Sequence, residues 1–176
     1  MNGNGVGMRK DHISPFFVLL AVLIGSGEES FAGSVSARLT VTAAIVRSCN
    51  LATTPLAFGT YDPVGSNASA DLRASTHLTV VCSSGATPTI GIGFGNNTPG
   101  MGTTRAMSSG SDKLSYEIYK DSGLTRVWTD SGSGIFSLGT IHSVLPQTVP
   151  VYGRIPAGQN VSLGSYSDTL TVTVNF

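Results

Sequence analysis

The segment Tyr166–Phe176, with the sequence YSDTLTVTVNF, decides the fold class of this chain. One set of alternate residues is mostly large and apolar, namely Tyr166, Asp168, Leu170, Val172, Val174 and Phe176. The residues between them are small and polar, namely Ser167, Thr169, Thr171, Thr173 and Asn175. Strict alternation is the period of a β-strand with one buried face, and 11 residues extend roughly 36 Å. We therefore expect a long strand that runs to the last residue with no turn after it.

A second alternating run lies near the other end of the chain. Its larger face consists of Val35, Ala37, Leu39, Val41, Ala43 and Ile45. Two arrangements fit this run. It is either the first strand of the chain's own sheet, or it extends away and another chain buries its apolar face. In the second arrangement the four larger side chains contribute about 6–12 kcal/mol in total, at about 1.5–3 kcal/mol each as an upper value.

Residues 1–32 have the features of a cleaved export signal. Arg9 and Lys10 form a positive region, Ile13–Ile24 is apolar except for Ser14, and Ser30-Phe31-Ala32 places small residues before a cleavage site. The apolar stretch is shorter than the roughly 20 residues that cross a bilayer, which disfavours the alternative of a retained membrane anchor. The chain is therefore predicted to be exported.

The composition indicates one all-β domain and argues against a nucleic-acid partner. The chain has 176 residues, which is long enough for a single well-formed core. Charged residues make up 11% and the formal net charge is zero, so no basic patch exists to neutralise phosphates. From residue 33 onward β-branched residues and turn formers dominate, which is typical of strands joined by turns.

The two cysteines, Cys49 and Cys82, both follow the signal segment. In an exported protein an even number of cysteines favours a disulfide. The bond would close a loop of about 34 residues and stabilise the fold by about 3–4 kcal/mol in the chain-entropy model. Two buried free thiols are the alternative. A metal site needs further ligands, and no histidine lies at ligand spacing from either cysteine.

Short strands and regular turns are expected along the rest of the chain. The predicted strands are Leu72–Cys82, Thr89–Phe94, Leu114–Ile118 and Val149–Ile155. Gly91 and Gly93 predict a bulge or a close approach of backbones, and Pro150 predicts an edge strand or the start of a strand. This pattern of seven or so strands indicates a β-sandwich.

No arrangement of residues points to catalysis, a metal or a cofactor. His77 and His142 belong to no recognisable nucleophile–base pair. The carboxylates cluster around turns and are interpreted as turn residues and solvated strand faces; they are Asp112, Glu117, Asp121 and Asp130. We therefore predict that the protein is not an enzyme and binds no cofactor.

A set of short motifs in order along the chain supports a family resemblance. The motifs are Cys49, Phe58-Gly59-Thr60-Tyr61, Leu78–Cys82, Arg105-Ala106-Met107, Leu114–Asp121, Trp128, Val151–Pro156 and Gly164–Phe176. Taken together they resemble the spore coat protein U domain, which pilin subunits of the archaic chaperone–usher pathway share. The resemblance covers the chain from Val35 to Phe176.

The resemblance implies an incomplete immunoglobulin-like β-sandwich that an N-terminal donor strand from a neighbouring subunit completes. Residues 33–47 take the place of the donor strand, and residues 48–176 take that of the sandwich domain. Addition of a donor strand in pilins is an established form of β-augmentation. The resemblance also implies that a periplasmic chaperone fills the groove first and that exchange occurs at an outer-membrane usher. The strand that borders the groove would present Tyr166, Leu170, Val172, Val174 and Phe176, with the Phe176 carboxylate held by basic chaperone residues.

The predicted function is that of a structural pilus subunit, exported through the periplasm to the cell surface, supporting adhesion and biofilm formation. Its predicted partners are other pilin subunits, the chaperone and the usher. One alternative is a spore- or cell-coat protein of the same fold. Another is a carbohydrate- or surface-binding module with an aromatic platform of Tyr119, Trp128 and Tyr152, although Trp128 fits a core position better. Ala37 and Ala43 fill pockets poorly, so the donor register remains open, and a one-residue slip would turn the other face inward.

Overall fold

The computed structural model describes residues 32–97 and 104–176, and these residues form an all-β structure. The predicted export signal therefore lies almost wholly outside the described residues. The strands are β1 (Cys49–Thr53), β2 (Leu72–Cys82), β3 (Thr89–Ile92), β4 (Arg105–Ser109), β5 (Asp112–Tyr119), β6 (Phe136–Ser137), β7 (Gln147–Ile155) and β8 (Val172–Asn175). A short 3-10 turn, η1, covers Gly132–Gly134. No helix in the described part of the chain has the length and apolar character needed to cross a membrane.

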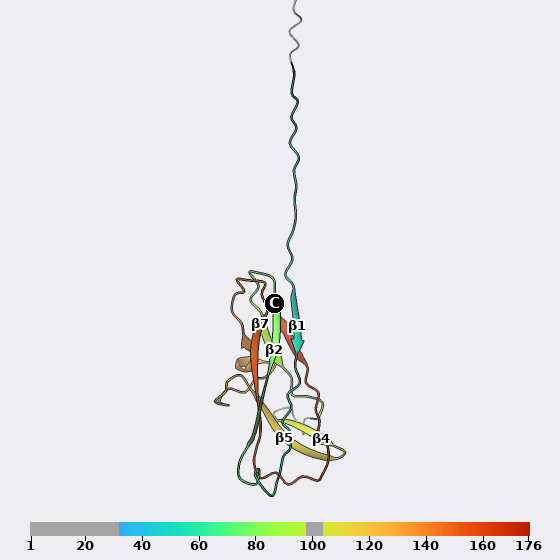
Figure 1. Ribbon diagram of the computed structural model, residues 1–176, viewed down its shortest axis with the longest axis vertical. Helices are drawn as coiled ribbons and strands as arrows, with labels where there is room; N and C mark the ends of the chain where they lie inside the picture. The colour runs from blue at the N-terminus through green and yellow to red at the C-terminus, as the bar shows by residue number, and fades with distance from the viewer. Residues whose placement is uncertain (1–31, 98–103) are drawn as a thin grey trace, which may run out of the picture. The chain divides into compact units, whose positions relative to one another are not determined.

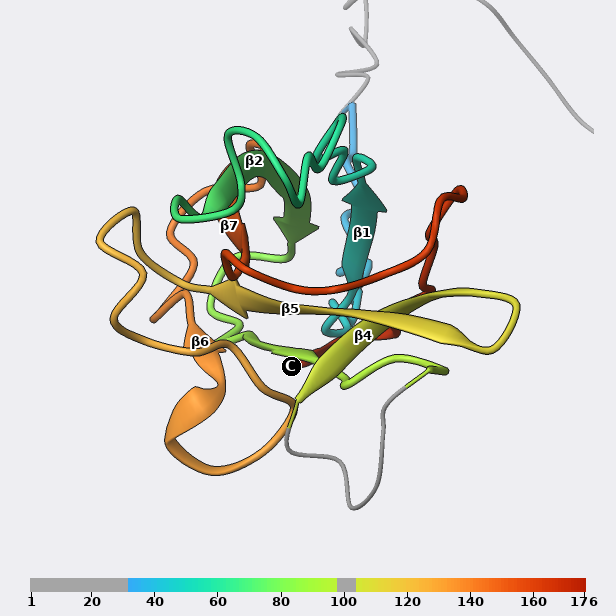
Figure 2. The same cartoon turned by 90° about the horizontal axis from the view of Figure 1, so that it is seen from below.

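The strands form two antiparallel sheets, which confirms the predicted fold class. The larger sheet has five strands in the order β1-β2-β7-β5-β4, and the smaller has three in the order β6-β3-β8. Figure 1 shows β2 between β1 and β7, and Figure 2 shows the β4–β5 hairpin from below. Because β8 pairs with β3 while its chain neighbours approach β4, the C-terminal segment contacts both sheets.

The hydrophobic core contains residues of both sheets. Leu78 and Val80 come from β2, Ile118 from β5 and Val149 from β7, while Ile90 comes from β3 of the smaller sheet. All five are at most 3% exposed. Their alternation along each strand places every second side chain toward the same interior, as the period of a half-buried strand requires.

Contacts along the chain divide it into two units, Met1–Thr42 and Ala43–Phe176. In the first unit, residues 32–42 are exposed and form no helix or strand. The second unit holds all the described strands. The boundary falls within the predicted donor segment, residues 33–47.

Several predicted strand limits hold and others change. Leu72–Cys82 matches β2 residue for residue, while β5 and β7 each begin two residues before the predicted range. The predicted Thr89–Phe94 strand ends at Ile92. A Cβ on Gly91 would lie 2.9 Å from the Cα of Asp130, so the predicted close backbone approach is confirmed.

The expected position of Pro150 at an edge or at a strand start needs correction. Pro150 lies inside β7, which is flanked by β2 and β5. It pairs only with His77 of β2, because β5 reaches no further along β7 than Tyr152. The missing N–H of proline is therefore harmless at a point where one side of the strand has no neighbour.

The C-terminal segment is not one continuous strand of 11 residues. Only Val172–Asn175 lies in β8, and Ser167 forms an isolated bridge with Ser108 of β4. The predicted alternation is nevertheless present, since Tyr166, Asp168, Leu170, Val172 and Val174 are half-buried and the residues between them are exposed. The segment has the pattern of a strand without a partner along its whole length.

Candidate functional site

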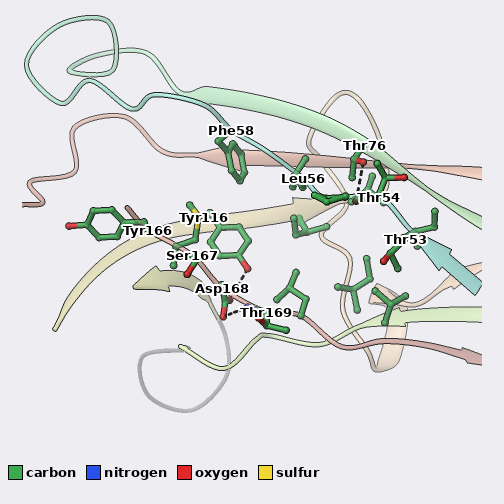
Figure 3. A pocket seen from close by; sticks show the side chains of 18 residues that line it. Thr53, Thr54, Leu56, Phe58, Thr76, Tyr116, Tyr166, Ser167, Asp168 and Thr169 are labelled. Atoms are coloured by element: carbon green, nitrogen blue, oxygen red, sulfur yellow. Dashed lines mark hydrogen bonds between the residues drawn. The ribbon is translucent and has the colours of Figure 1, made fainter. Parts of the chain in front are cut away.

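Two adjoining clefts of about 460 and 560 Å³ run along one side of the second unit. Both are lined by Leu56, Phe58, Met107 and Tyr166, so we treat them as one groove. One side is formed by residues 53–61, which we call the N-terminal rim. The other is formed by residues 161–172, which we call the C-terminal rim. Figure 3 shows side chains of both rims facing the space between them.

The floor of the groove is apolar and belongs to the core. It is formed by Leu78, Ile92, Met107, Leu114, Tyr116, Ile118, Val151 and Ile155. These residues come from β2, β3, β4, β5 and β7, whose alternation turns the same set of side chains inward. Except for the half-buried Met107, these side chains are at most 6% exposed, so the clefts reach down to side chains of the core.

The backbone of both rims has unused hydrogen-bonding groups. Among the described residues, the backbone of residues 55–60 makes no hydrogen bond, and neither does that of Leu170. Leu56 and Phe58 instead hold the N-terminal rim by packing on β7, where a Cβ on Gly153 would come within 2.6 Å of both side chains. The N-terminal rim thus offers a run of unpaired backbone groups and the C-terminal rim offers those of Leu170, which is the environment that an added β-strand could fill.

Asp168 anchors the middle of the C-terminal rim. Its Oδ2 accepts a hydrogen bond from the Tyr116 hydroxyl at 2.8 Å. Its Oδ1 accepts from Asn97 Nδ2 at 2.9 Å, from the Asn96 N–H at 3.1 Å and from the Thr169 N–H at 2.9 Å. Burial and the hydrogen bond to the Asp168 carboxylate raise the pKa of Tyr116 above its ordinary value. The hydroxyl is therefore a permanent donor near neutral pH.

Arg105 fixes β4 against the smaller sheet and does not line the groove. Its side chain is fully buried and pairs with Glu117. The guanidinium also donates to the carbonyl oxygens of Gly93 at 2.9 Å, Ile92 at 2.7 Å and Trp128 at 2.7 Å. In the sequence, Arg105 stands out only as part of the family motif, because a single arginine at the start of a strand does not reveal that it is buried.

A family profile described as the Spore Coat Protein U domain matches residues 35–173. The chain belongs to the Spore Coat Protein U domain family. Protein U of Myxococcus xanthus is 39% identical to it over 131 residues, which cover 69% of this chain and 71% of that protein.

Solved structures extend the family likeness to pilus proteins. The chaperone–tip adhesion subunit pre-assembly complex CsuC–CsuE from archaic Csu pili of Acinetobacter baumannii matches with a TM-score of 0.54 and 27% identity. The match covers 75% of this chain and 40% of that chain. A chaperone–usher pilus, studied for the molecular basis of rod uncoiling, matches with a TM-score of 0.51 and 11% identity, covering 80% and 95% of the respective chains. The second likeness concerns the fold alone.

The spore coat protein U domain of this chain contains the predicted disulfide. Cys49 and Cys82 are bonded and lie opposite each other at the start of β1 and the end of β2. The same end of the domain is tied by backbone contacts, since the Ser83 N–H donates to the Ser48 carbonyl at 2.9 Å. The bond therefore fixes the point where residues 33–47 join the sandwich.

The predicted donor residues lie outside the sheets of the chain. Val35 is 101% exposed, Leu39 89%, Val41 83% and Ile45 95%, and residues 32–48 belong to no strand. Ala37 and Ala43 are exposed as well. The first strand that the structure assigns, β1, begins at Cys49.

The predicted groove-edge residues divide into two groups. Tyr166, Leu170 and Val172 line the groove. Val174 packs against the core from β8, and Phe176 is 50% exposed. The alternation in the sequence placed these residues on one face. It did not indicate that Tyr116 and Phe58, which come from distant segments, line the same groove.

The alternative of an aromatic platform is wrong, and the preferred core position of Trp128 is confirmed. Trp128 is fully buried, its Nε1 donates to the Ile90 carbonyl at 2.9 Å, and it stacks on Phe136. Tyr119 is only 4% exposed. Two of the three rings are thus unable to meet a ligand in solvent.

The remaining candidate residues occupy structural or exposed positions. His77 and His142 are exposed, and Asp121 accepts hydrogen bonds from Thr125 and from the Arg126 N–H in a turn. Within residues 32–97 and 104–176, no group of three or more histidine, cysteine or acidic side chains could hold a metal ion.

Proposed function

We propose that this protein is a structural subunit of a surface pilus, in which the groove of each subunit receives residues 33–47 of the next. The observation that carries the proposal is the apolar groove bounded by two rims with unpaired backbone groups. An inserted strand supplies hydrogen-bond partners to both rims and covers the floor at the same time. A small ligand would satisfy neither long backbone edge.

The N-terminal segment has the chemistry that this groove requires. Val35, Leu39, Val41 and Ile45 are almost fully exposed in the structure, so nearly all of their apolar area is available for burial. Their burial stabilises a subunit junction by about 6–12 kcal/mol before the cost of ordering the segment. Segment and groove belong to the same chain type, so one subunit can follow another without limit.

The remaining steps follow the likeness to the Csu complex, in which a chaperone is bound to a pilus subunit before assembly. By analogy, a periplasmic chaperone covers the groove of this chain until an outer-membrane usher presents the next donor segment. The role of the finished fibre is mechanical, in adhesion and biofilm formation at the cell surface, and involves no catalysis.

The test alters the two faces of the donor segment in separate variants. In one variant Val35, Leu39, Val41 and Ile45 are replaced by serine. In the matched control Ser34, Ser36, Thr40 and Thr42 on the other face are replaced by alanine. We expect fibres by electron microscopy from the control only, with the chaperone complex of the first variant intact. Normal fibres from the first variant would refute the proposal, and fibre loss in the control alone would place the register one residue away.

A coat protein is the second candidate, favoured by the 39% identity to Protein U of Myxococcus xanthus over most of its length. A coat would use the same groove in a layer on the cell or spore surface. Electron microscopy of producing cells, with and without the gene, distinguishes thin surface fibres from a continuous layer. Chaperone and usher genes beside this gene favour the pilus.

A further inference from the structure

The side chain of Tyr116 spans the floor of the groove and contacts both rims (Figure 3). Its ring meets Phe58 of the N-terminal rim edge to face, with centroids 6.1 Å apart and planes at 68°. Its hydroxyl donates to Asp168 of the C-terminal rim at 2.8 Å. One rigid side chain therefore links two edges that no backbone hydrogen bond between described residues connects.

Further hydrogen bonds hold Asp168 in place. Its bond to Tyr116 therefore also fixes the position of the C-terminal rim. Asn97 donates through Nδ2 to Asp168 and also to the Ser167 carbonyl at 3.0 Å. Gly95, with φ of 90°, allows this approach, because a Cβ there would lie 2.1 Å from Asp168 Oδ2. The carboxylate thus fastens the rim to the segment that follows β3.

The C-terminal rim needs such an anchor where it crosses between the sheets. Ser167 exchanges two backbone hydrogen bonds with Ser108 of β4, and the Thr171 carbonyl accepts from the Gly93 N–H at 2.9 Å. Between these points the backbone pairs with no strand of the described chain. An empty apolar groove lowers its free energy by closing, because closure removes apolar surface from water.

We propose that Tyr116 and Asp168 are positioning residues that hold the two rims at a fixed separation while the groove is empty. This role rests on the proposed strand-binding function. It explains how the groove stays open before a strand binds. A preformed site binds faster and more tightly because the cost of opening it is not taken from the binding energy. The raised pKa of the Tyr116 hydroxyl keeps its proton, and hence the link, in place.

Loss of the hydroxyl should allow the rims to approach each other. In Tyr116→Phe the ring still packs on Phe58, but Asp168 Oδ2 loses its donor. A hydrogen bond to a charged group corresponds to a change of about tenfold or more in an equilibrium constant. We expect peptide association to slow by about tenfold, because most of the molecules then have a closed groove.

The test measures the distance between the rims directly in the full chain after removal of the signal. Spin labels on T60C and S165C report the distance distribution by double electron–electron resonance. A synthetic peptide of residues 33–47 is the binding probe. Tyr119→Phe removes a hydroxyl from the same strand at a residue that does not line the groove. Ile141→Val gives a small loss of stability in the core, also away from the groove.

In Tyr116→Phe and Asp168→Ala we expect a shorter and broader distribution that the peptide restores to the wild-type one. Tyr119→Phe and Ile141→Val should keep the wild-type distribution and binding rate. If Tyr116→Phe behaves like Ile141→Val, with lower thermal stability but unchanged distance and rate, the positioning role is refuted. If the peptide fails to bind the wild-type chain, the proposed function is refuted, while the distances in the empty groove still decide the positioning role.

Discussion

The core of this domain is fully buried on one side and borders an open groove on the other. On one side, Trp128, Ile90 and the Arg105 side chain are fully buried, and Arg105 donates to the carbonyl oxygens of Ile92 and Trp128. On the groove side, Met107 and Leu170 are only half-buried, and the backbone of residues 55–60 makes no hydrogen bond within the described part of the chain. This difference supports the proposal that the groove receives another chain segment.

The largest loss of stability is expected from replacing Arg105 on the fully buried side of the core. Replacement by leucine leaves Glu117 partly buried without its partner and three carbonyl groups without donors. We expect a loss of about 3–5 kcal/mol in the free energy of unfolding, measured in urea. Arg154→Leu is the control, since its ion pair with Asp71 is about one-third exposed and contributes about 0–1 kcal/mol. Equal losses for the two variants would contradict the comparison.

Removal of the disulfide should weaken both sides together. Replacement of Cys49 and Cys82 by alanine frees the closed loop in the unfolded chain, and we expect a loss of about 3–4 kcal/mol. Thiol labelling of the unreduced native protein provides the check, since labelling of both cysteines would show that the bond is absent.

The donor segment should affect the fibre and leave the subunit unchanged. Leu39→Ala removes apolar area that is buried only after assembly, so we expect each junction to lose about 1.5–3 kcal/mol. The measurement is the denaturant concentration at which fibres dissociate, with Thr40→Ala as the matched change on the other face. A lower stability of the isolated Leu39→Ala subunit would count against the proposed arrangement.

Oxidation of Met107 should report whether the groove is filled. Hydrogen peroxide transfers one oxygen atom to the thioether sulfur and leaves water, and the polar sulfoxide then disfavours apolar packing. We expect oxidation of Met107 in the monomer and protection in the fibre, measured by mass spectrometry, with urea-unfolded chain as the fully accessible control. Equal oxidation of monomer and fibre would show that nothing covers this part of the groove.

Alkaline pH gives the smallest expected effect. The folded chain raises the pKa of Tyr116 above the ordinary value of about 10. The stability linked to this proton is complete below that ordinary value and is lost as the pH rises from there through the raised pKa. Unfolding of wild type should therefore become easier above about pH 10 than that of Tyr116→Phe, relative to neutral pH. Parallel pH profiles of the two proteins would contradict the assignment.

Alternation in the sequence revealed which residues face inward, but it did not reveal what they pair with. The pattern of residues 166–176 is present in their half-burial, yet only Val172–Asn175 has a neighbouring strand in this chain. Residues 33–47 have the same pattern and belong to no strand of the described chain, while β1 was missed because it is short and follows them directly. Strand propensity is a local property, whereas strand pairing depends on distant segments.

The polar groups of the groove and core could not be predicted for the same reason. Tyr116 and Asp168 are 52 residues apart, and their hydrogen bond depends on β5 meeting the C-terminal rim. Arg105 is indistinguishable from a surface arginine until β3 and Trp128 surround it. The disulfide was predictable because an exported chain with two cysteines has only one possible pairing within the chain.

Amide hydrogen exchange with the 33–47 peptide tests the central claim most directly. If a strand completes the groove, the amides of residues 56–60 and of Leu170 gain protection together, because both rims acquire hydrogen-bond partners at once. A peptide with Leu39→Asp serves as the matched control and should give no protection. Unchanged exchange at both rims, or protection confined to other surfaces, would contradict the account.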